Sequence, residues 1–345
     1  MADPADTELV ALDTEALVAY LRGLLPIGPE APTIALLHGG RSNLTYRVSG
    51  TAESWVVRRP PLGVVAPSAN DMGREFTVLR GLTDSDVPVP EAIHLCEDVA
   101  VIGAPFLVMS FVEGTVVRSE ADAARLGPAA SDHARLLVEQ LARLHAVDPS
   151  AVGLDEFGRP VGYLQRQVSR WWRQWEIVHT RDLEGIRELH HRLERNVPAE
   201  SRASIVHGDY RIDNVLFDPD GTRITAVLDW EMSTLGDPLS DLATLLVYWD
   251  PICAPLLADG NPISGNPAFP SQDELVQLYA DAAATDPGDM SFHLALAYFK
   301  SAVIAEGIHR RFVDGDTVGG DFARVGDGVE PLVAAGLERL GAGAR

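Results

Sequence analysis

The sequence predicts an α+β fold in which short strands come first and helices follow. Apolar segments of strand length alternate with glycine and proline turns between Thr33 and Pro60, and another such segment runs over Pro105–Gly114. Beyond that point, alanines and leucines recur at helical spacing, as they do from Ala134 to Leu144. The chain has 345 residues, 46% of them hydrophobic, which suffices for the core of one large or two ordinary domains.

The first predicted element is a helix that Asp13 caps and that runs through Leu25. Its apolar side chains fall on one face, which is formed by Leu12, Ala16, Leu17, Tyr20, Leu21 and Leu24. Such a face is typical of a helix that packs on a sheet. Three short strands are predicted next, between Thr33 and Pro60.

The turn between the first two of these strands, His38–Asn43, contains two adjacent glycines. A glycine turn between strands allows backbone amides to approach a phosphate closely. Gly40, Ser42 and Asn43 are therefore candidate nucleotide-binding residues. The alternative is an ordinary hairpin turn, because a glycine pair serves that purpose as well.

Two segments of the second half predict a loop, a hairpin and a final strand. The loop is His207–Leu216, and the segment Ile224–Leu228 reads as an apolar strand. Asp218–Gly221 lies between them and contains the proline and glycine of a hairpin turn. Since a hairpin returns the chain to its starting point, polar residues of the loop and the residue after the strand can converge.

Three side chains in these segments have the chemistry that phosphoryl transfer requires. The reaction needs a carboxylate that orients and deprotonates the attacking hydroxyl, and oxygen ligands for Mg²⁺. Asp209 is the candidate base, and Asn214 is the candidate amide ligand for a metal ion. Asp229, directly after the apolar strand, is the candidate principal Mg²⁺ ligand. Each residue alone could be a turn residue, but the joint pattern indicates function.

These residues resemble a known family of enzymes. The segments His207–Asn214, Leu228–Glu231 and Gly236–Ala243 are similar to those of the aminoglycoside phosphotransferase and choline kinase superfamily. Within it, the chain most resembles the branch that includes the kinase-like domains fused to acyl-CoA dehydrogenases. The likeness extends from about residue 30 to residue 315.

The resemblance implies a bilobal protein-kinase-like fold. It places a small antiparallel sheet in an N-lobe of residues 1–111 and a larger, mostly helical C-lobe in residues 112–345. It further implies ATP as the phosphoryl donor, Mg²⁺ as the metal ion and a small hydroxylated molecule as the acceptor.

By the same resemblance, two arginines are expected to contact phosphates. Arg58 occupies the strand position where kinases carry the lysine that binds the α- and β-phosphates, and Glu75 is its expected partner. The alternative for Glu75 is a solvated helix carboxylate. Arg211 stands two residues after Asp209, where protein kinases place a lysine that stabilises charge on the γ-phosphate. The alternative for Arg211 is a surface cation.

The segment Pro105–Gly114 resembles the last N-lobe strand of a kinase running into the hinge. The resemblance assigns Met109 as the gatekeeper and turns the Ser110 carbonyl and the Val112 amide toward adenine. An ordinary buried strand would have the same residues.

Supporting and acceptor-binding roles are expected elsewhere. His145 and His207 are expected to be hydrogen-bonded packing residues, and Asp241 is expected to anchor the catalytic loop. Acceptor recognition is expected in Arg166–Trp175 and Phe299–Phe312, where aromatic residues and cations alternate. The tryptophans there are also typical of a protein core.

Composition bears on the type of partner and on the location of the protein. The formal charge of −22 disfavours nucleic acid, because a polyanion would be repelled. Two cysteines, Cys96 and Cys253, are too few for a disulfide framework and indicate the cytoplasm. The acidic N-terminus and the absence of a run of about 18 apolar residues disfavour secretion and membrane spanning. Oligomeric state is left open.

The resulting hypothesis is an ATP- and Mg²⁺-dependent small-molecule kinase of the aminoglycoside phosphotransferase type. A hydroxyacyl-CoA kinase shares the chemistry with another acceptor. A nucleotide-binding scaffold without catalysis is the alternative of another class. A protein kinase is disfavoured, because the stretch from Asp229 to Asp241 is too short for an activation segment of that kind.

Overall fold

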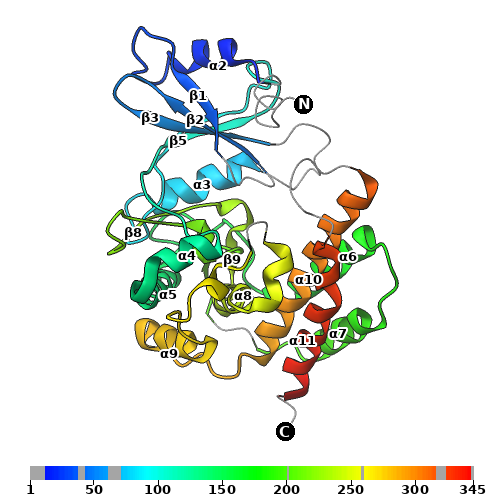
Figure 1. Cartoon of the computed structure of the whole chain (residues 1–345). Coiled ribbons are helices and arrows are strands. Elements are labelled where there is room, and N and C mark those ends of the chain that lie inside the picture. Colours follow the sequence, from blue (N-terminus) through cyan, green and yellow to red (C-terminus); the bar gives the residue numbers. More distant parts are fainter. Residues whose placement is uncertain are drawn as a thin grey trace. The chain divides into compact units, whose positions relative to one another are not determined.

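The computed structural model describes residues 12–37, 43–60, 71–199, 202–257, 260–315 and 324–342. The chain forms two compact units. The first runs to Glu113 and also includes Thr225–Glu231, and the second contains the rest. The first unit carries a five-stranded antiparallel sheet and the second is mostly helical (Figure 1), so the predicted bilobal, kinase-like α+β fold is confirmed. The lobe boundary after residue 111 stays a prediction.

One antiparallel sheet organises the first unit. Its strands are β1 Thr33–Leu36, β2 Leu44–Ser49, β3 Ser54–Arg59, β4 Ala92–Cys96 and β5 Phe106–Ser110. They lie in the order β1-β2-β3-β5-β4, and each neighbouring pair is antiparallel. Aromatic and β-branched residues suit a pleated, buried surface, and Tyr46, Trp55 and Phe106 belong to the apolar core of this sheet.

Helix α2, Thr14–Leu21, begins as predicted and ends earlier than predicted. The Asp13 carboxylate accepts a hydrogen bond from the Ala16 amide at 2.9 Å, which is the expected cap. The prediction that the helix reaches Leu25 was wrong, because Gly23 weakens a helix interior and the chain turns after Arg22. Leu24 is consequently exposed and lies off the packed face.

Helix α3, Met72–Leu82, supplies one half of the candidate site in the first unit. Asp71 caps it by accepting hydrogen bonds from the Gly73 and Arg74 amides at 2.9 and 3.1 Å. Its buried side chains include Val78 and Leu79. This helical register also buries Glu75, four residues after the cap.

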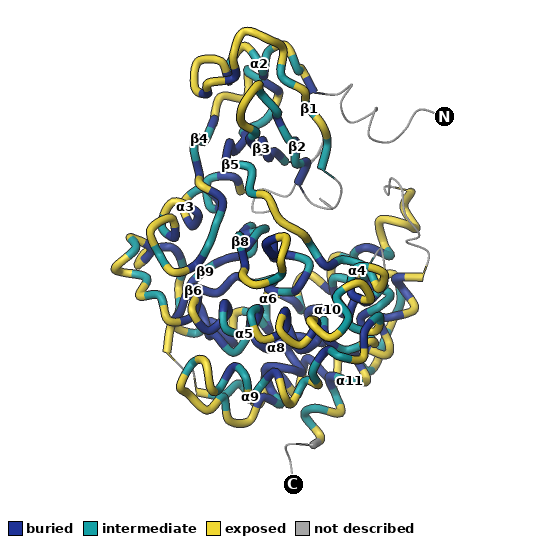
Figure 2. The backbone as a smooth tube through the Cα atoms, turned by 60° about the vertical axis from the view of Figure 1, so that its left-hand side comes forward, coloured by how far each residue is buried: buried dark blue, intermediate teal, exposed yellow. Residues whose placement is uncertain are grey.

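The second unit is built from helices around two short strands that lead into and out of the candidate loop. Its helices are α4 Glu120–Leu126, α5 Ala130–Ala146, α6 Tyr163–Val178, α7 Glu184–Arg195, α8 Leu239–Trp249, α9 Gln272–Ala283, α10 Ser291–Asp314 and α11 Val329–Ala342. Figure 2 shows that α8 and α10 are largely buried. These two helices form the core against which the loop packs.

Short strands fix both ends of the loop. Strand β6, Ser204–Val206, pairs antiparallel with β9, Thr234–Gly236, directly before the loop and before α8. Strands β7, Val215–Phe217, and β8, Ile224–Val227, follow as predicted, and Asp218 closes the turn by accepting the Thr222 amide at 2.7 Å. Among the helices that the structure describes, none is long and apolar enough to cross a membrane.

Candidate active site

The candidate residues fall into two clusters, one in each unit. In the first unit, the guanidinium of Arg58 on β3 pairs with the carboxylate of Glu75 on α3 at 3.1 Å. Both side chains are buried, at 11% and 2% exposure, so the Glu75 carboxylate is not a solvated helix residue. Burial raises the pKa of Glu75 to about 7, although Arg58 opposes the shift. The predicted partner of Arg58 is thus in place.

The same guanidinium also contacts two carboxylates that follow β8. Arg58 forms an ion pair with Asp229 and lies 3.4 Å from Glu231. Burial by itself lowers the pKa of Arg58, but Glu75, Asp229 and Glu231 outweigh it, so the pKa is raised. Carboxylates outnumber cations among these residues. A cluster of excess acidic oxygens has the chemistry of a Mg²⁺ site, because hard divalent cations prefer such ligands.

Asp229 has an unusual backbone. Its φ of 66° places it in the left-handed region, which it shares with only one other non-glycine residue in the described segments, Ala284. Aspartate tolerates this conformation better than most residues, and strained backbone is frequent at functional sites. The turn that directs the Asp229 carboxylate toward Arg58 therefore depends on this conformation.

Asn43 belongs to the same cluster. Its side chain is buried, and its Nδ2 donates a hydrogen bond to Glu231 Oε2 at 2.7 Å. Of the three residues predicted in the first turn of the sheet, Asn43 is thus linked to the acidic cluster. Gly40 and Ser42 lie outside the residues that the structure describes.

The predicted hinge residues lie at the end of β5. Met109 is buried and pairs in register with Val56 of β3. Ser110 forms two hydrogen bonds with Glu91, in which its amide donates to the Glu91 carbonyl and its hydroxyl accepts from the Glu91 amide, each at 2.9 Å. Val112 follows the strand and is partly exposed. Their roles toward adenine stay predictions.

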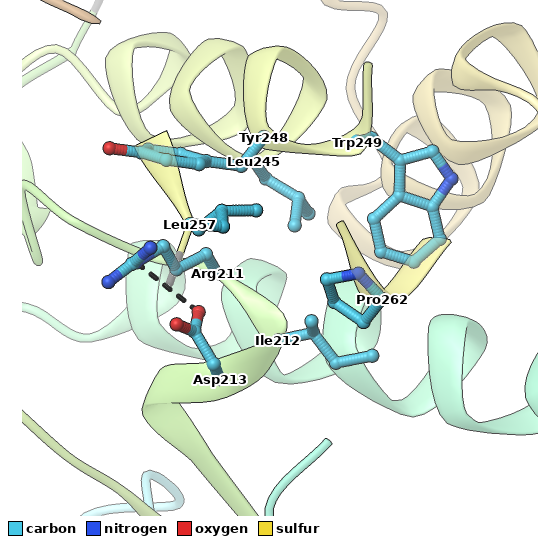
Figure 3. A pocket seen from close by; sticks show the side chains of 8 residues that line it. All are labelled: Arg211, Ile212, Asp213, Leu245, Tyr248, Trp249, Leu257 and Pro262. Carbon is cyan, nitrogen blue, oxygen red and sulfur yellow. Dashed lines mark ion pairs between the residues drawn. The ribbon is translucent and has the colours of Figure 1, made fainter. Parts of the chain in front are cut away.

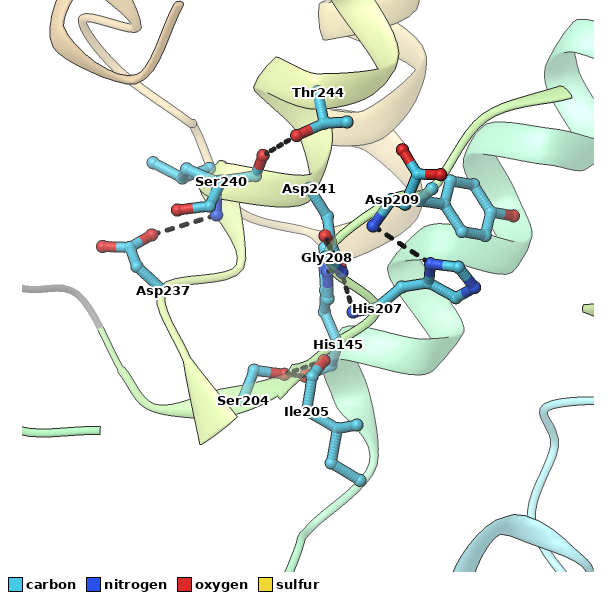
Figure 4. A network of polar contacts seen from close by, with 12 residues as sticks. His145, Ser204, Ile205, His207, Gly208, Asp209, Asp237, Ser240, Asp241 and Thr244 are labelled. Carbon is cyan, nitrogen blue, oxygen red and sulfur yellow. Dashed lines mark hydrogen bonds and ion pairs between the residues drawn. The ribbon is translucent and has the colours of Figure 1, made fainter. Parts of the chain in front are cut away.

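In the second unit, Asp241 of α8 anchors the loop (Figure 4). Its carboxylate accepts hydrogen bonds from the backbone amides of His207 at 2.6 Å and Gly208 at 2.8 Å. His145 of α5 lies 3.4 Å from the same carboxylate and 2.8 Å from the hydroxyl of Tyr279. These contacts give Asp241, His145 and His207 the supporting positions expected of them.

The polar side chains of the loop are held by one another. Asn214 Nδ2 donates to the backbone carbonyl of Asp209 at 2.8 Å and to its Oδ2 at 3.2 Å. Arg211 Nε lies 3.3 Å from the carboxylates of both Asp209 and Asp213. Thus the structure brings together the candidate base and the candidate amide ligand of the second unit.

Arg211 is not a simple surface cation. Its guanidinium lies 4.7 Å from the ring centre of Tyr248 in α8, and its side chain is only 21% exposed. A cation over an aromatic face is stabilised by the ring quadrupole. Burial raises the pKa of the neighbouring Asp213, and Arg211 opposes this shift.

A narrow pocket opens beside these residues (Figure 3). Its lining side chains are Arg211, Ile212, Asp213, Leu245, Tyr248, Trp249, Leu257 and Pro262. Most of them are apolar, and the charged pair of Arg211 and Asp213 lies at one side.

Three residues of the second unit lie at the loop without having been predicted there, and one of them, Lys300, was expected only in the acceptor-binding segment Phe299–Phe312. Asp213 and Tyr248 flank Arg211, and Lys300 of α10 donates a hydrogen bond to the Gly208 carbonyl. Asp213 lies inside the loop motif, so its position was a usable signal. Lys300 is the only lysine of the chain, and this was the signal that could have singled it out.

The segments expected to recognise the acceptor are largely committed to packing. Trp171 and Trp175 of α6 are buried, as is Phe299 of α10. Glu306 of α10 is fully buried, and its carboxylate forms an ion pair with the Arg181 guanidinium, with an N–O distance of 2.9 Å. The core alternative for these tryptophans is therefore the one that the packing supports.

Comparison with known proteins places this geometry in context. The phosphotransferase enzyme family matches residues 33–281. Acyl-CoA dehydrogenase family member 11 of Gallus gallus is 37% identical over 337 residues, covering 94% of this chain and 43% of that protein. The protein of the same name from Homo sapiens is 36% identical over 336 residues, with the same two coverages. The chain therefore spans less than half the length of these relatives.

Solved structures agree on the fold. A structure from Ralstonia eutropha named for the aminoglycoside phosphotransferases has a TM-score of 0.77 and 31% identity, and the match covers 96% of this chain and 99% of that chain. A ternary complex of an aminoglycoside phosphotransferase APH(4)-Ia mutant with AMP-PNP and hygromycin B has a TM-score of 0.57, with 90% and 94% of the two chains covered. At 17% identity, the second likeness concerns the fold alone.

Proposed function

This chain belongs to the phosphotransferase enzyme family, and from that premise we propose that it is an ATP- and Mg²⁺-dependent kinase of a small hydroxylated molecule. The observation that carries the proposal is the loop of the second unit, where Asp241 fixes the backbone and Asn214 holds the Asp209 carboxylate. A general base must be held in one orientation to accept a proton efficiently.

Each candidate residue then has a defined role. Asp209 accepts the proton of the acceptor hydroxyl as its oxygen attacks the terminal phosphorus of ATP, while the bond from that phosphorus to the bridging oxygen breaks and ADP leaves. Arg211, held beside Asp209, stabilises the charge on the transferred phosphoryl group. Asn214 and Asp229 would each offer an oxygen ligand to Mg²⁺, which when bound would neutralise the polyphosphate.

Nucleotide binding is assigned to the first unit. Arg58, oriented by Glu75, is proposed to contact the α- and β-phosphates as lysine does in other kinases. Gly40, Ser42 and Asn43 are proposed to contribute to phosphate binding. The adenine ring is proposed to lie against Met109, with backbone groups of Ser110 and Val112 as its hydrogen-bonding partners.

The acceptor has two candidates of different chemistry. Structural neighbours include a complex with hygromycin B, which supports an aminoglycoside-like hydroxylated acceptor. The curated relatives at 36–37% identity are named acyl-CoA dehydrogenase family members, which supports a hydroxyacyl-CoA acceptor.

Free, buried Cys96 and Cys253 are compatible with the proposed cytoplasmic location. The net charge of −22 supports a small molecule over nucleic acid.

A phosphorylation screen tests the proposal. The purified chain is mixed with γ-labelled ATP, Mg²⁺ and two acceptor panels, one of hydroxyacyl-CoA esters with the free hydroxy acids and one of aminoglycosides. We expect label on a hydroxylated acceptor of one panel. The Asp209→Ala variant should lower turnover by ~10² or more if Asp209 is the general base.

The same assay separates catalysis from scaffolding. A non-catalytic scaffold would bind nucleotide without any transfer and without Asp209-dependent ATP hydrolysis. Turnover at the wild-type rate in both Asp209→Ala and Asp229→Ala would remove the mechanism proposed here.

A further inference from the structure

Lys300 is an exception in the composition of this chain. The sequence has 28 lysine and arginine residues, and Lys300 is the only lysine among them. It lies in the middle of α10 and is 92% buried, with a relative exposure of 8%. A buried ammonium group is costly unless it is hydrogen-bonded or paired. The contacts of the Lys300 ammonium group therefore indicate its role in the structure.

The Lys300 ammonium faces the candidate catalytic loop. It donates a hydrogen bond to the backbone carbonyl of Gly208 and lies 5.8 Å from the ring centre of Trp171 in α6. Burial lowers the pKa of Lys300, while the carboxylates of Asp209 and Asp241 oppose that shift. An ammonium is compact, whereas a guanidinium needs the room of a planar fork.

A hydrogen bond, a positive φ and a close backbone neighbour restrict the position of Gly208. Its amide donates to Asp241 Oδ1 at 2.8 Å, and its φ is +84°. A Cβ at this position would meet the backbone carbonyl oxygen of Met232 at 2.5 Å. The residue has no freedom to move away from Lys300 without disturbing the loop.

The peptide unit between Gly208 and Asp209 is held at both polar ends. Its carbonyl accepts from Lys300, and its amide N–H, which belongs to Asp209, donates to His207 Nδ1 at 3.2 Å. Because a peptide unit is planar and rigid, fixing both ends fixes the position of the Asp209 Cα. On the other side of this Cα, the Asp209 carbonyl accepts from Asn214 Nδ2 at 2.8 Å, so the backbone is held on both sides of the Asp209 side chain. Lys300 is therefore linked to the Asp209 backbone through the Gly208 carbonyl.

We propose that Lys300 is a positioning residue that orients Asp209 through the Gly208 carbonyl. This inference rests on the proposed function of Asp209 as the general base. Misplacement of a catalytic group by a small distance can lower a rate by about 10²-fold. The uncharged, nearly isosteric Lys300→Met removes the hydrogen bond and keeps most of the packing.

Two measurements test the proposal. The first is a double-mutant cycle with Asp209→Asn: Lys300→Met should lower kcat about tenfold or more while KM for MgATP changes less than about twofold. In the Asp209→Asn background, Lys300→Met should change the residual rate less than about twofold, because the positioned group is already lost. If Lys300 had only a structural role, Lys300→Met would lower the rate by the same factor in the wild-type and Asp209→Asn backgrounds. That result would overturn the proposal.

The second measurement needs no activity. Hydrogen exchange of the peptide covering His207–Asn214 should be about tenfold faster in Lys300→Met. Glu306→Gln, which removes another buried charge from α10, is the matched control and should leave this peptide unchanged. Equal exchange in both variants would contradict the role of Lys300. If Lys300→Met does not fold, Lys300→Leu, which also lacks a donor for the Gly208 carbonyl, replaces it under the same criteria.

The two tests also separate this inference from the proposed function. If the wild type transfers no phosphoryl group to any acceptor, the proposed function fails, while the exchange result still decides whether Lys300 orders the loop. If the wild type is active and the cycle is additive, only the role of Lys300 fails.

Discussion

A single guanidinium, that of Arg58, is surrounded by the carboxylates of Glu75, Asp229 and Glu231. An arginine can serve several acidic partners at once, because its planar head carries donors in different directions. A lysine in the same place would offer one point charge. The arginine therefore fits the cluster of this unit as it stands, and Asn43 also donates a hydrogen bond to Glu231.

Removing Arg58 should leave Glu75 buried without its cation. We expect Arg58→Met to lower the free energy of unfolding by about 3–5 kcal/mol, as is typical when one partner of a buried pair is lost. The double variant Arg58→Met/Glu75→Met should recover part of that loss, because the most deeply buried of the three carboxylates is removed together with its cation. Urea unfolding of both variants measures the difference. A double variant less stable than the single one would contradict this account.

Gly208 provides a second prediction at the scale of one residue. Gly208→Ala places a Cβ at 2.5 Å from the Met232 carbonyl oxygen, in a residue with φ of +84°. Gly103 has φ of +81° and no heavy atom within 4 Å of an added Cβ, so Gly103→Ala is the matched control. The left-handed backbone alone costs about 1–2 kcal/mol in each variant.

Only Gly208→Ala should lower the free energy of unfolding by more than about 1–2 kcal/mol and also lower kcat. Thermal unfolding and kcat of the two variants provide the measurement. Equal effects of the two substitutions would mean that the close approach of Met232 has no energetic consequence.

At the scale of elements, helix α8 determines the shape of the loop through Asp241. Burial by itself would raise the pKa of this carboxyl, but the hydrogen bond from His145, the charges of His145 and His207 and the amide of His207 lower it overall. A carboxyl whose pKa is lowered by folding stabilises the native state above its unfolded pKa of about 3.9. That stabilisation is lost as pH falls below this value toward the folded pKa.

Asp241→Asn should test this link between α8 and the loop. An amide can accept with one oxygen only, so one of the two backbone amides, of His207 or Gly208, loses its partner. We expect a loss of about 1–3 kcal/mol in the free energy of unfolding at neutral pH. The difference from the wild type should shrink below about pH 4. A difference that is constant from pH 7 to pH 3 would contradict the lowered pKa.

Elements with strong local signals could be predicted from the sequence. The turn between β7 and β8 has proline and glycine, and the structure closes it where expected, on Asp218. The Asp13 cap is also local, and it is present. The end of α2 was missed by one turn, because the apolar pattern continued to Leu24 although Gly23 weakens the helix.

Contacts between distant elements could not be predicted where the family resemblance assigned no partner. The Lys300 contact with Gly208 spans 92 residues, and it depends on how α10 packs against the loop. The stacking of Arg211 on Tyr248 depends in the same way on the rotation of α8. One sequence fixes helical periodicity, but the partner of each face is decided by packing.

At the scale of the whole molecule, bound MgATP should stabilise the folded chain. Any ligand that binds only the folded state adds to stability by mass action, roughly 2.7 kcal/mol at a concentration 100 times its Kd. We therefore expect Tm to rise when ATP and Mg²⁺ are present together. The rise should disappear with EDTA and in Asp229→Ala, whereas Asp155→Ala, which changes an exposed aspartate, should keep it. Scanning calorimetry measures all four conditions. An equal rise in EDTA, or in Asp229→Ala, would show that nucleotide binding does not depend on the metal ligand assigned here.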